Sequence, residues 1–169
     1  MDDRFELADL ILNQVADAVI CTDRSGTIIR WNRASTALFG YPAEEALGQS
    51  IDLIIPQHLR AAHWTGFEAA MTGGTLKLQG RPTLTRAQHQ SGRRLYIEMT
   101  FAIVKDHAES EVLGAVAMAR DATERVERER ASAGGIGGSV KEAKQPAWSP
   151  QAVDTSVRKP AARLRGFGR

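Results

Sequence analysis

The sequence contains a single cysteine, Cys21, among its 169 residues. It therefore has no disulfide within one chain and no metal site built from several thiolates. Long apolar runs are absent too, because the longest, Val112–Ala119, falls far short of the roughly 20 residues that cross a bilayer. The N-terminus has no basic segment followed by an apolar one. We therefore expect a cytoplasmic protein that is neither secreted nor membrane-bound.

Charge is distributed unevenly along the chain. Residues 1–131 hold 15 Lys and Arg against 18 Asp and Glu, whereas residues 132–169 hold 7 against 2. The second part is rich in glycine, serine and proline and has few large apolar side chains, so it cannot bury enough surface to offset the entropy of ordering. We predict a disordered basic tail over 132–169. It contains no motif that reads a nucleic-acid groove, so we expect no nucleic-acid partner.

The first part of the chain begins with a predicted helix and hairpin. Apolar side chains at helical spacing predict an amphipathic N-terminal helix over 1–16. Two short apolar segments then predict strands over 18–22 and 27–31. The segment Asp23–Gly26 between them is typical of a turn, so the two strands form an antiparallel hairpin.

Three helices are predicted after this hairpin. Asn32 suits an N-cap and Gly40 a C-cap, which predicts a short helix between them. A second short helix is expected over 43–47, after Pro42. Residues 57–71 favour a longer helix, on which Leu59, His63, Phe67 and Ala70 share one face.

Regular alternation of apolar and more polar residues over 95–103 predicts the longest strand. A turn before it makes 82–88 its hairpin partner, and 112–120 forms a last strand. A charged helix over 123–131 then leaves the folded unit. This order predicts an α+β fold in which helices cover one face of an antiparallel sheet and enclose a small cavity.

Several segments of the chain resemble the PAS family of bacterial sensory domains. The likeness extends over about residues 8–130, and the segments that carry it follow the family's order: Ala18–Asp23, Ile29–Ala34, Phe39–Tyr41, Ser91–Arg93 and Arg120–Arg125.

The resemblance implies a PAS domain over 17–122, with a five-stranded antiparallel sheet and a cavity for a cofactor or metabolite. It also implies a homodimer formed through the flanking helices. The family's role is signal transduction, here to a separate partner such as a kinase or a transcription regulator. Asp121 and Thr123 match the exit motif, in which these two residues tie the last strand to the signalling helix over 123–131.

The central helix is similar to that of rhizobial oxygen-sensing PAS domains. Pro56 is followed by Arg60 and His63, and the likeness makes His63 the proximal ligand of a haem iron. Thr83 stands where those sensors carry an arginine that binds oxygen. The cofactor site implied by the resemblance comprises His63, Phe67, Thr83, Ile97, Met99 and Phe101.

Other functions stay open at this point. Non-covalent flavin is the second cofactor candidate, with Trp31 or Trp64 beside it, whereas Cys21 lies on the wrong element for a flavin adduct. A ligand-free dimerisation or docking module is the alternative function, and a cavity filled by its own side chains would favour it. We expect no enzyme, because His58 and His63 point about 140° apart on a helix and no phosphate-binding loop occurs.

Overall fold

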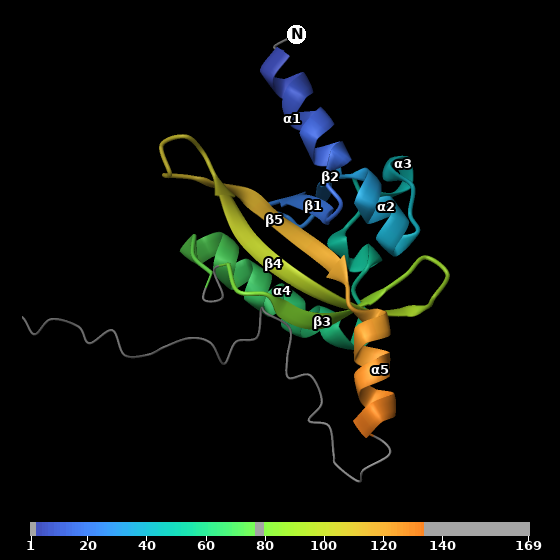
Figure 1. Cartoon of the computed structure of the whole chain (residues 1–169). Coiled ribbons are helices and arrows are strands. Elements are labelled where there is room, and N and C mark those ends of the chain that lie inside the picture. The colour runs from blue at the N-terminus through green and yellow to red at the C-terminus, as the bar shows by residue number, and fades with distance from the viewer. Residues whose placement is uncertain (1–2, 77–79, 134–169) are drawn as a thin grey trace, which may run out of the picture.

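The computed structural model describes residues 3–76 and 80–133, with side chains from residue 6 onwards. These residues form one five-stranded antiparallel sheet with helices at its edges and across one face (Figure 1). The strands lie in the order β2-β1-β5-β4-β3. Their bounds are β1 (Ala18–Asp23), β2 (Ile28–Trp31), β3 (Thr83–Gln88), β4 (Arg94–Lys105) and β5 (Val112–Asp121).

The helices follow the predicted order. In Figure 1, α4 lies across the sheet, while α1 and α5 extend away from it at opposite sides of the view. The bounds are α1 (Asp3–Gln14), α2 (Arg33–Phe39), α3 (Ala43–Ala46), the 3-10 turn η1 (Ile51–Leu53), α4 (Gln57–Gly73) and α5 (Thr123–Ala133). The fold class predicted from the sequence is confirmed, and the predicted tail over 132–169 lies almost wholly outside the described residues. In the described part of the chain, no helix has the length and apolar character needed to span a bilayer.

Asn32 holds the first hairpin to its neighbours. Its side-chain oxygen accepts hydrogen bonds from the backbone N–H groups of Val19 and Ser35, both at 2.9 Å. Its amide nitrogen donates to the carbonyl oxygens of Leu12 and Asp17. The predicted N-cap of α2 is therefore also the joint between α1 and β1, because one side chain satisfies backbone groups of three elements.

The hairpin turn packs directly on α4. Gly26 has φ +81°, and a Cβ atom added to it would lie 2.3 Å from the Trp64 ring. The Trp64 indole nitrogen in turn donates to a carboxylate oxygen of Asp52 at 3.0 Å. Only glycine combines this backbone conformation with so close an approach. These contacts fix α4 against the far end of the β1–β2 hairpin.

Strand β4 buries side chains on both of its faces over its first half. Leu95, Ile97 and Met99 belong to the main hydrophobic core, as the alternation predicted. Tyr96 points to the other face and is only 4% exposed, because it packs with Ala122 in a separate small cluster beside α5. The other face of β4 is therefore more buried than the sequence pattern indicated.

Candidate functional site

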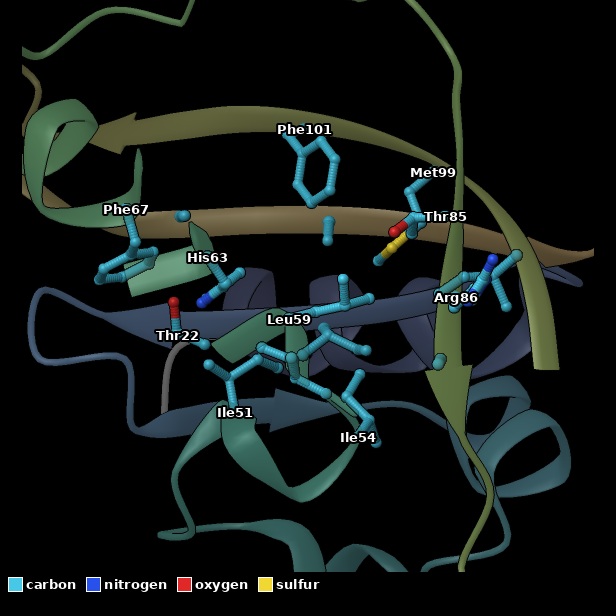
Figure 2. Close-up of a pocket in the computed structure, with 16 residues that line it drawn as sticks. Thr22, Ile51, Ile54, Leu59, His63, Phe67, Thr85, Arg86, Met99 and Phe101 are labelled. Atoms are coloured by element: carbon cyan, nitrogen blue, oxygen red, sulfur yellow. The ribbon is translucent and has the colours of Figure 1, made fainter. Parts of the chain in front are cut away.

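A cavity of about 80 Å³ lies between α4, η1 and the inner face of the sheet. Figure 2 shows its lining, to which α4 contributes Leu59, His63 and Phe67. Strand β4 contributes three apolar side chains at alternate positions: Ile97, Met99 and Phe101. The structure thus brings together five of the six residues predicted for the site, and most of the remaining lining is aliphatic.

Thr83, the sixth predicted residue, does not line the cavity. It pairs with Met99 near the beginning of β3. Two residues further along, Thr85 pairs with Ile97 and lines the cavity instead. Thr83 and Thr85 lie on the same face of β3, because side chains alternate along a strand. The predicted residue is therefore on the correct face but two residues away from the one that lines the cavity.

The imidazole of His63 lies among aromatic rings. Its centroid is 5.8 Å from that of Phe67, nearly parallel, and 5.4 Å from that of Trp64, edge to face. Burial lowers the pKa of His63 to about 4, although the negative charge of Asp52 acts in the opposite direction. His63 is therefore neutral at physiological pH, as an imidazole that binds a metal or accepts a hydrogen bond must be.

Thr22 lines the cavity but was not among the residues predicted for it. Its side chain is 6% exposed and lines the cavity, and its hydroxyl oxygen has no hydrogen-bond partner among the described residues. In Figure 2 this hydroxyl points from β1 towards the space beside His63 and Phe67. Strand alternation supplies the missed signal, because Thr22 shares a face with the core residue Ile20.

Among the described residues, one charged side chain lines the cavity. Arg86 belongs to β3, the strand at the edge of the sheet, and is partly exposed. Arg86 was not among the residues predicted to line the cavity. The positive charge therefore lies at the β3 side of a cavity whose other polar groups, Thr22, His63 and Thr85, are neutral.

The predicted exit motif forms a second cluster, where β5 meets α5. The Asp121 carboxylate accepts a hydrogen bond from the backbone N–H of Thr123 at 2.8 Å, which caps the beginning of α5. The Thr123 hydroxyl accepts from the backbone N–H of Tyr96 at 3.0 Å. The carbonyl of Tyr96 accepts from the N–H of Ala122 at 2.8 Å. The beginning of α5 is thereby tied to the backbone of β4.

Side chains of α5 reach the same part of β4 further along the helix. The Arg130 guanidinium lies 4.7 Å from the centre of the Tyr96 ring and also donates a hydrogen bond to its hydroxyl. Arg125 forms an ion pair with Glu98. Tyr96 therefore contacts both the first turn and the last turn of α5.

The remaining candidates from the sequence lie elsewhere. Trp31 donates its indole N–H to the Thr36 hydroxyl and the Tyr41 carbonyl, and it does not line the cavity. Cys21 faces away from the cavity on β1, and burial raises the pKa of its thiol. His58 is exposed on α4. Within residues 3–76 and 80–133, no three His, Cys, Asp or Glu side chains are grouped as metal ligands.

Comparison with known proteins agrees with this geometry. The family model described as PAS fold matches residues 12–127. The chain is 29% identical over 112 residues to the Oxygen sensor protein DosP of Escherichia coli (strain K12), a match that covers 66% of this chain and 14% of that protein. It is 30% identical over 122 residues to an uncharacterized protein of Azorhizobium caulinodans, with 72% and 16% covered. The chain thus spans about one seventh of the length of these relatives.

A solved structure is similar over the same region. The PAS domain of a protein from Colwellia psychrerythraea is 27% identical to this chain, with a TM-score of 0.60. The match covers 73% of this chain and all of that one. The similarity therefore supports the PAS fold over about three quarters of the chain.

Proposed function

Because the chain belongs to the PAS family, we propose that it is a sensory domain that binds a ligand in its cavity and signals to a partner protein through α5. One observation carries this proposal. Strand β4 lines the cavity with Ile97 and Met99 on one face, and holds α5 with Tyr96 and Glu98 on the other. Ligand binding in the cavity and the position of α5 are thereby coupled through adjacent residues of a single strand.

The signal would pass through short contacts. A ligand that displaces Ile97 also moves Tyr96, because the two share a peptide bond. Tyr96 holds the beginning of α5 through Thr123, which Asp121 orients by capping the helix. In this proposal Asp121 and Thr123 transmit the signal, the role that the family resemblance implies for them. The structural change that the partner detects would be a tilt of α5 or its release from β4.

The partner is a signalling protein, with a kinase or a transcription regulator as the class expected for this family. A homodimer would place two copies of α5 beside each other. Apolar side chains on α1 support dimer formation through the flanking helices, because Leu7, Leu10 and Ile11 are each more than half exposed. The relative that is named an oxygen sensor supports a sensory role for this region.

Haem is the first cofactor to be considered. The neutral imidazole of His63 would suit an axial ligand, and the apolar side chains of β4 would suit the face of a porphyrin. Ligand sites for molecules of drug size, however, measure roughly 300–1,000 Å³, whereas this cavity measures about 80 Å³. The donor fits, but the macrocycle does not fit between α4 and the sheet. The flavin ring system, our second candidate, meets the same limit.

The alternative function is a ligand-free docking module. The side chains around the cavity favour it in part, because they leave only a small space. The unpartnered hydroxyl of Thr22 favours a ligand, because a purely structural core has no use for a buried polar group without a partner.

The proposal is tested by following the cavity and helix α5 in the same experiment. We expect that small molecules which shift the NMR signals of Ile97 and Met99 also shift those of residues 124–133. In Asp121→Ala the cavity shifts should persist, while the shifts in α5 fall at least threefold, because the helix has lost its capping contact to Thr123.

Glu109→Ala is the matched control, since Glu109 is an exposed acidic residue in the loop between β4 and β5. It should leave both responses unchanged. Binding in the cavity without any response of α5 in the unsubstituted chain would contradict a sensory role.

A further inference from the structure

The buried hydroxyl of Thr22 indicates what kind of molecule the cavity takes. A hydroxyl that leaves water without gaining a hydrogen bond destabilises the folded protein. Thr22 is 6% exposed and its oxygen has no partner among the described residues. By contrast, the buried polar side chains of Asn32 and Ser35, at the beginning of α2, are both hydrogen-bonded. The unmet group is therefore confined to the cavity.

Water is a poor occupant of this space. A buried water molecule needs two to four polar partners. Thr22, His63 and Thr85 are polar, but the rest of the lining is mainly apolar, with Ile20, Ile51, Phe67 and Ala115 among its residues. A molecule with one polar group and an apolar remainder matches this lining better, because it satisfies Thr22 and fills the rest of the space with carbon.

The volume limits the size of such a molecule. An apolar cavity of roughly 150 Å³ holds one benzene molecule. The present cavity is about half as large, at about 80 Å³. Benzene has six non-hydrogen atoms, so by proportion the matching ligand has about three or four in the cavity as it stands.

The charges around the cavity limit the ligand further. His63 is neutral, and within residues 3–76 and 80–133 no carboxylate lines the cavity to balance a cation. In the same part of the chain, Arg86 is the one charged group that lines it, and it lies at the partly exposed β3 side, away from Thr22 in Figure 2. A net charge placed beside Thr22 would be buried without a counter-charge, which is costly.

Building on the proposed sensory function, we propose that the cavity binds a compact, uncharged, mostly apolar molecule whose single hydrogen-bonding group contacts the hydroxyl of Thr22. Thr22 is thus a ligand-binding residue. Neither a haem nor a flavin is the resident group.

Four probes of similar shape test this inference on the full chain. Propan-2-ol carries a hydroxyl, 2-methylpropane replaces it by a methyl group, propan-2-amine is a cation at neutral pH, and acetate is an anion, and each has four non-hydrogen atoms. Binding is measured from the saturation of NMR shifts at Ile97 and Met99, because molecules of this size bind weakly. We expect propan-2-ol to bind at least threefold more tightly than the other three.

The substitution Thr22→Val keeps the shape of the side chain and removes its hydroxyl. We expect it to weaken the binding of propan-2-ol about fivefold, to leave the binding of 2-methylpropane unchanged or tighter, and to raise the Tm of the free protein. A purely structural threonine would not give higher stability together with lower affinity. Thr100→Val is the matched control on β4, since Thr100 is half-buried and does not line the cavity, and it should change neither affinity.

Several outcomes would overturn the inference. The first is equal binding of propan-2-ol to the unsubstituted chain and to Thr22→Val. The others are tighter binding of acetate, saturation by none of the four probes, and a stoichiometric haem complex whose Soret band is lost in His63→Ala. The last outcome would leave the sensory function standing. Conversely, Thr22-dependent binding of propan-2-ol without a response in α5 would support the ligand assignment while contradicting the sensory function.

Discussion

Two buried polar side chains on opposite sides of the β1–β2 hairpin differ in how well they are satisfied. Asn32 is 4% exposed and exchanges hydrogen bonds with backbone groups of α1, β1 and α2. Thr22 is buried to a similar degree, and its hydroxyl has no partner among the described residues. The first side chain contributes to stability, and the second lowers it. The fold thus separates a polar joint that holds the structure together from a polar group that a ligand can use.

Asn32→Ala should have the largest effect on this comparison. It leaves the N–H of Val19, the N–H of Ser35 and two carbonyls without partners, so we expect the free energy of unfolding to fall by about 4 kcal/mol. Urea unfolding followed by circular dichroism measures this loss. Asn13→Ala, at an exposed position of α1, should change it by about 0.5 kcal/mol or less. A loss of similar size at both positions would remove the special role of Asn32.

Gly26 lies where the hairpin meets α4, and Gly26→Ala should have the next largest effect. The added methyl group enters a left-handed backbone position and overlaps the ring of Trp64. We expect a loss of about 3 kcal/mol in the free energy of unfolding. Gly92 has the same φ of +81° with nothing within 4 Å, so Gly92→Ala should cost about 1 kcal/mol, the backbone cost alone. Equal losses would show that the contact with Trp64 is not tight.

The smallest effect concerns His63 and appears only in acid. Its pKa is about 4 in the folded chain and near 6.5 when unfolded. Between these values the unfolded chain binds a proton that the folded chain does not, so the free energy of unfolding falls as the pH falls from 6.5 towards 4. The full shift corresponds to about 3 kcal/mol, and partial solvent exposure of the imidazole reduces our expectation to about 2 kcal/mol.

Unfolding in urea at pH 7 and at pH 4.5 measures this dependence in the unsubstituted chain and in His63→Phe. The difference between the two pH values should shrink in the variant. His58→Gln is the matched control, because His58 is exposed on the same helix, and it should keep the dependence of the unsubstituted chain. An unchanged pH dependence in His63→Phe would contradict burial of this imidazole in its neutral form.

The elements and the side of the sheet that faces the cavity were predictable, because both follow from local spacing. The period of two along β4 placed Ile97, Met99 and Phe101 on one face, and the helical spacing on α4 placed His63 and Phe67 on one face. The family resemblance then assigned both faces to the cavity, which they line. The N-cap at Asn32 and the left-handed position at Gly40 also follow from residue type alone.

Properties that depend on distant packing were not predictable. The burial of Tyr96 requires α5 to fold back on β4, and alternation within one strand contains no information on that. Thr85 rather than Thr83 lines the cavity, and this depends on the register in which β3 pairs with β4. The isolation of the Thr22 hydroxyl and the size of the cavity depend on how closely α4 approaches the sheet, which no pattern in the sequence specifies.

The division of β4 between its two faces has a consequence for how this domain can diversify. Residues 97, 99 and 101 touch the cavity, whereas residues 96 and 98 hold α5. Under the proposed function, substitution at the odd-numbered positions changes mainly the choice of ligand, and substitution at the even-numbered ones changes mainly the contact with α5. A single strand of twelve residues thus offers evolution, or an engineer, two distinct sets of sites.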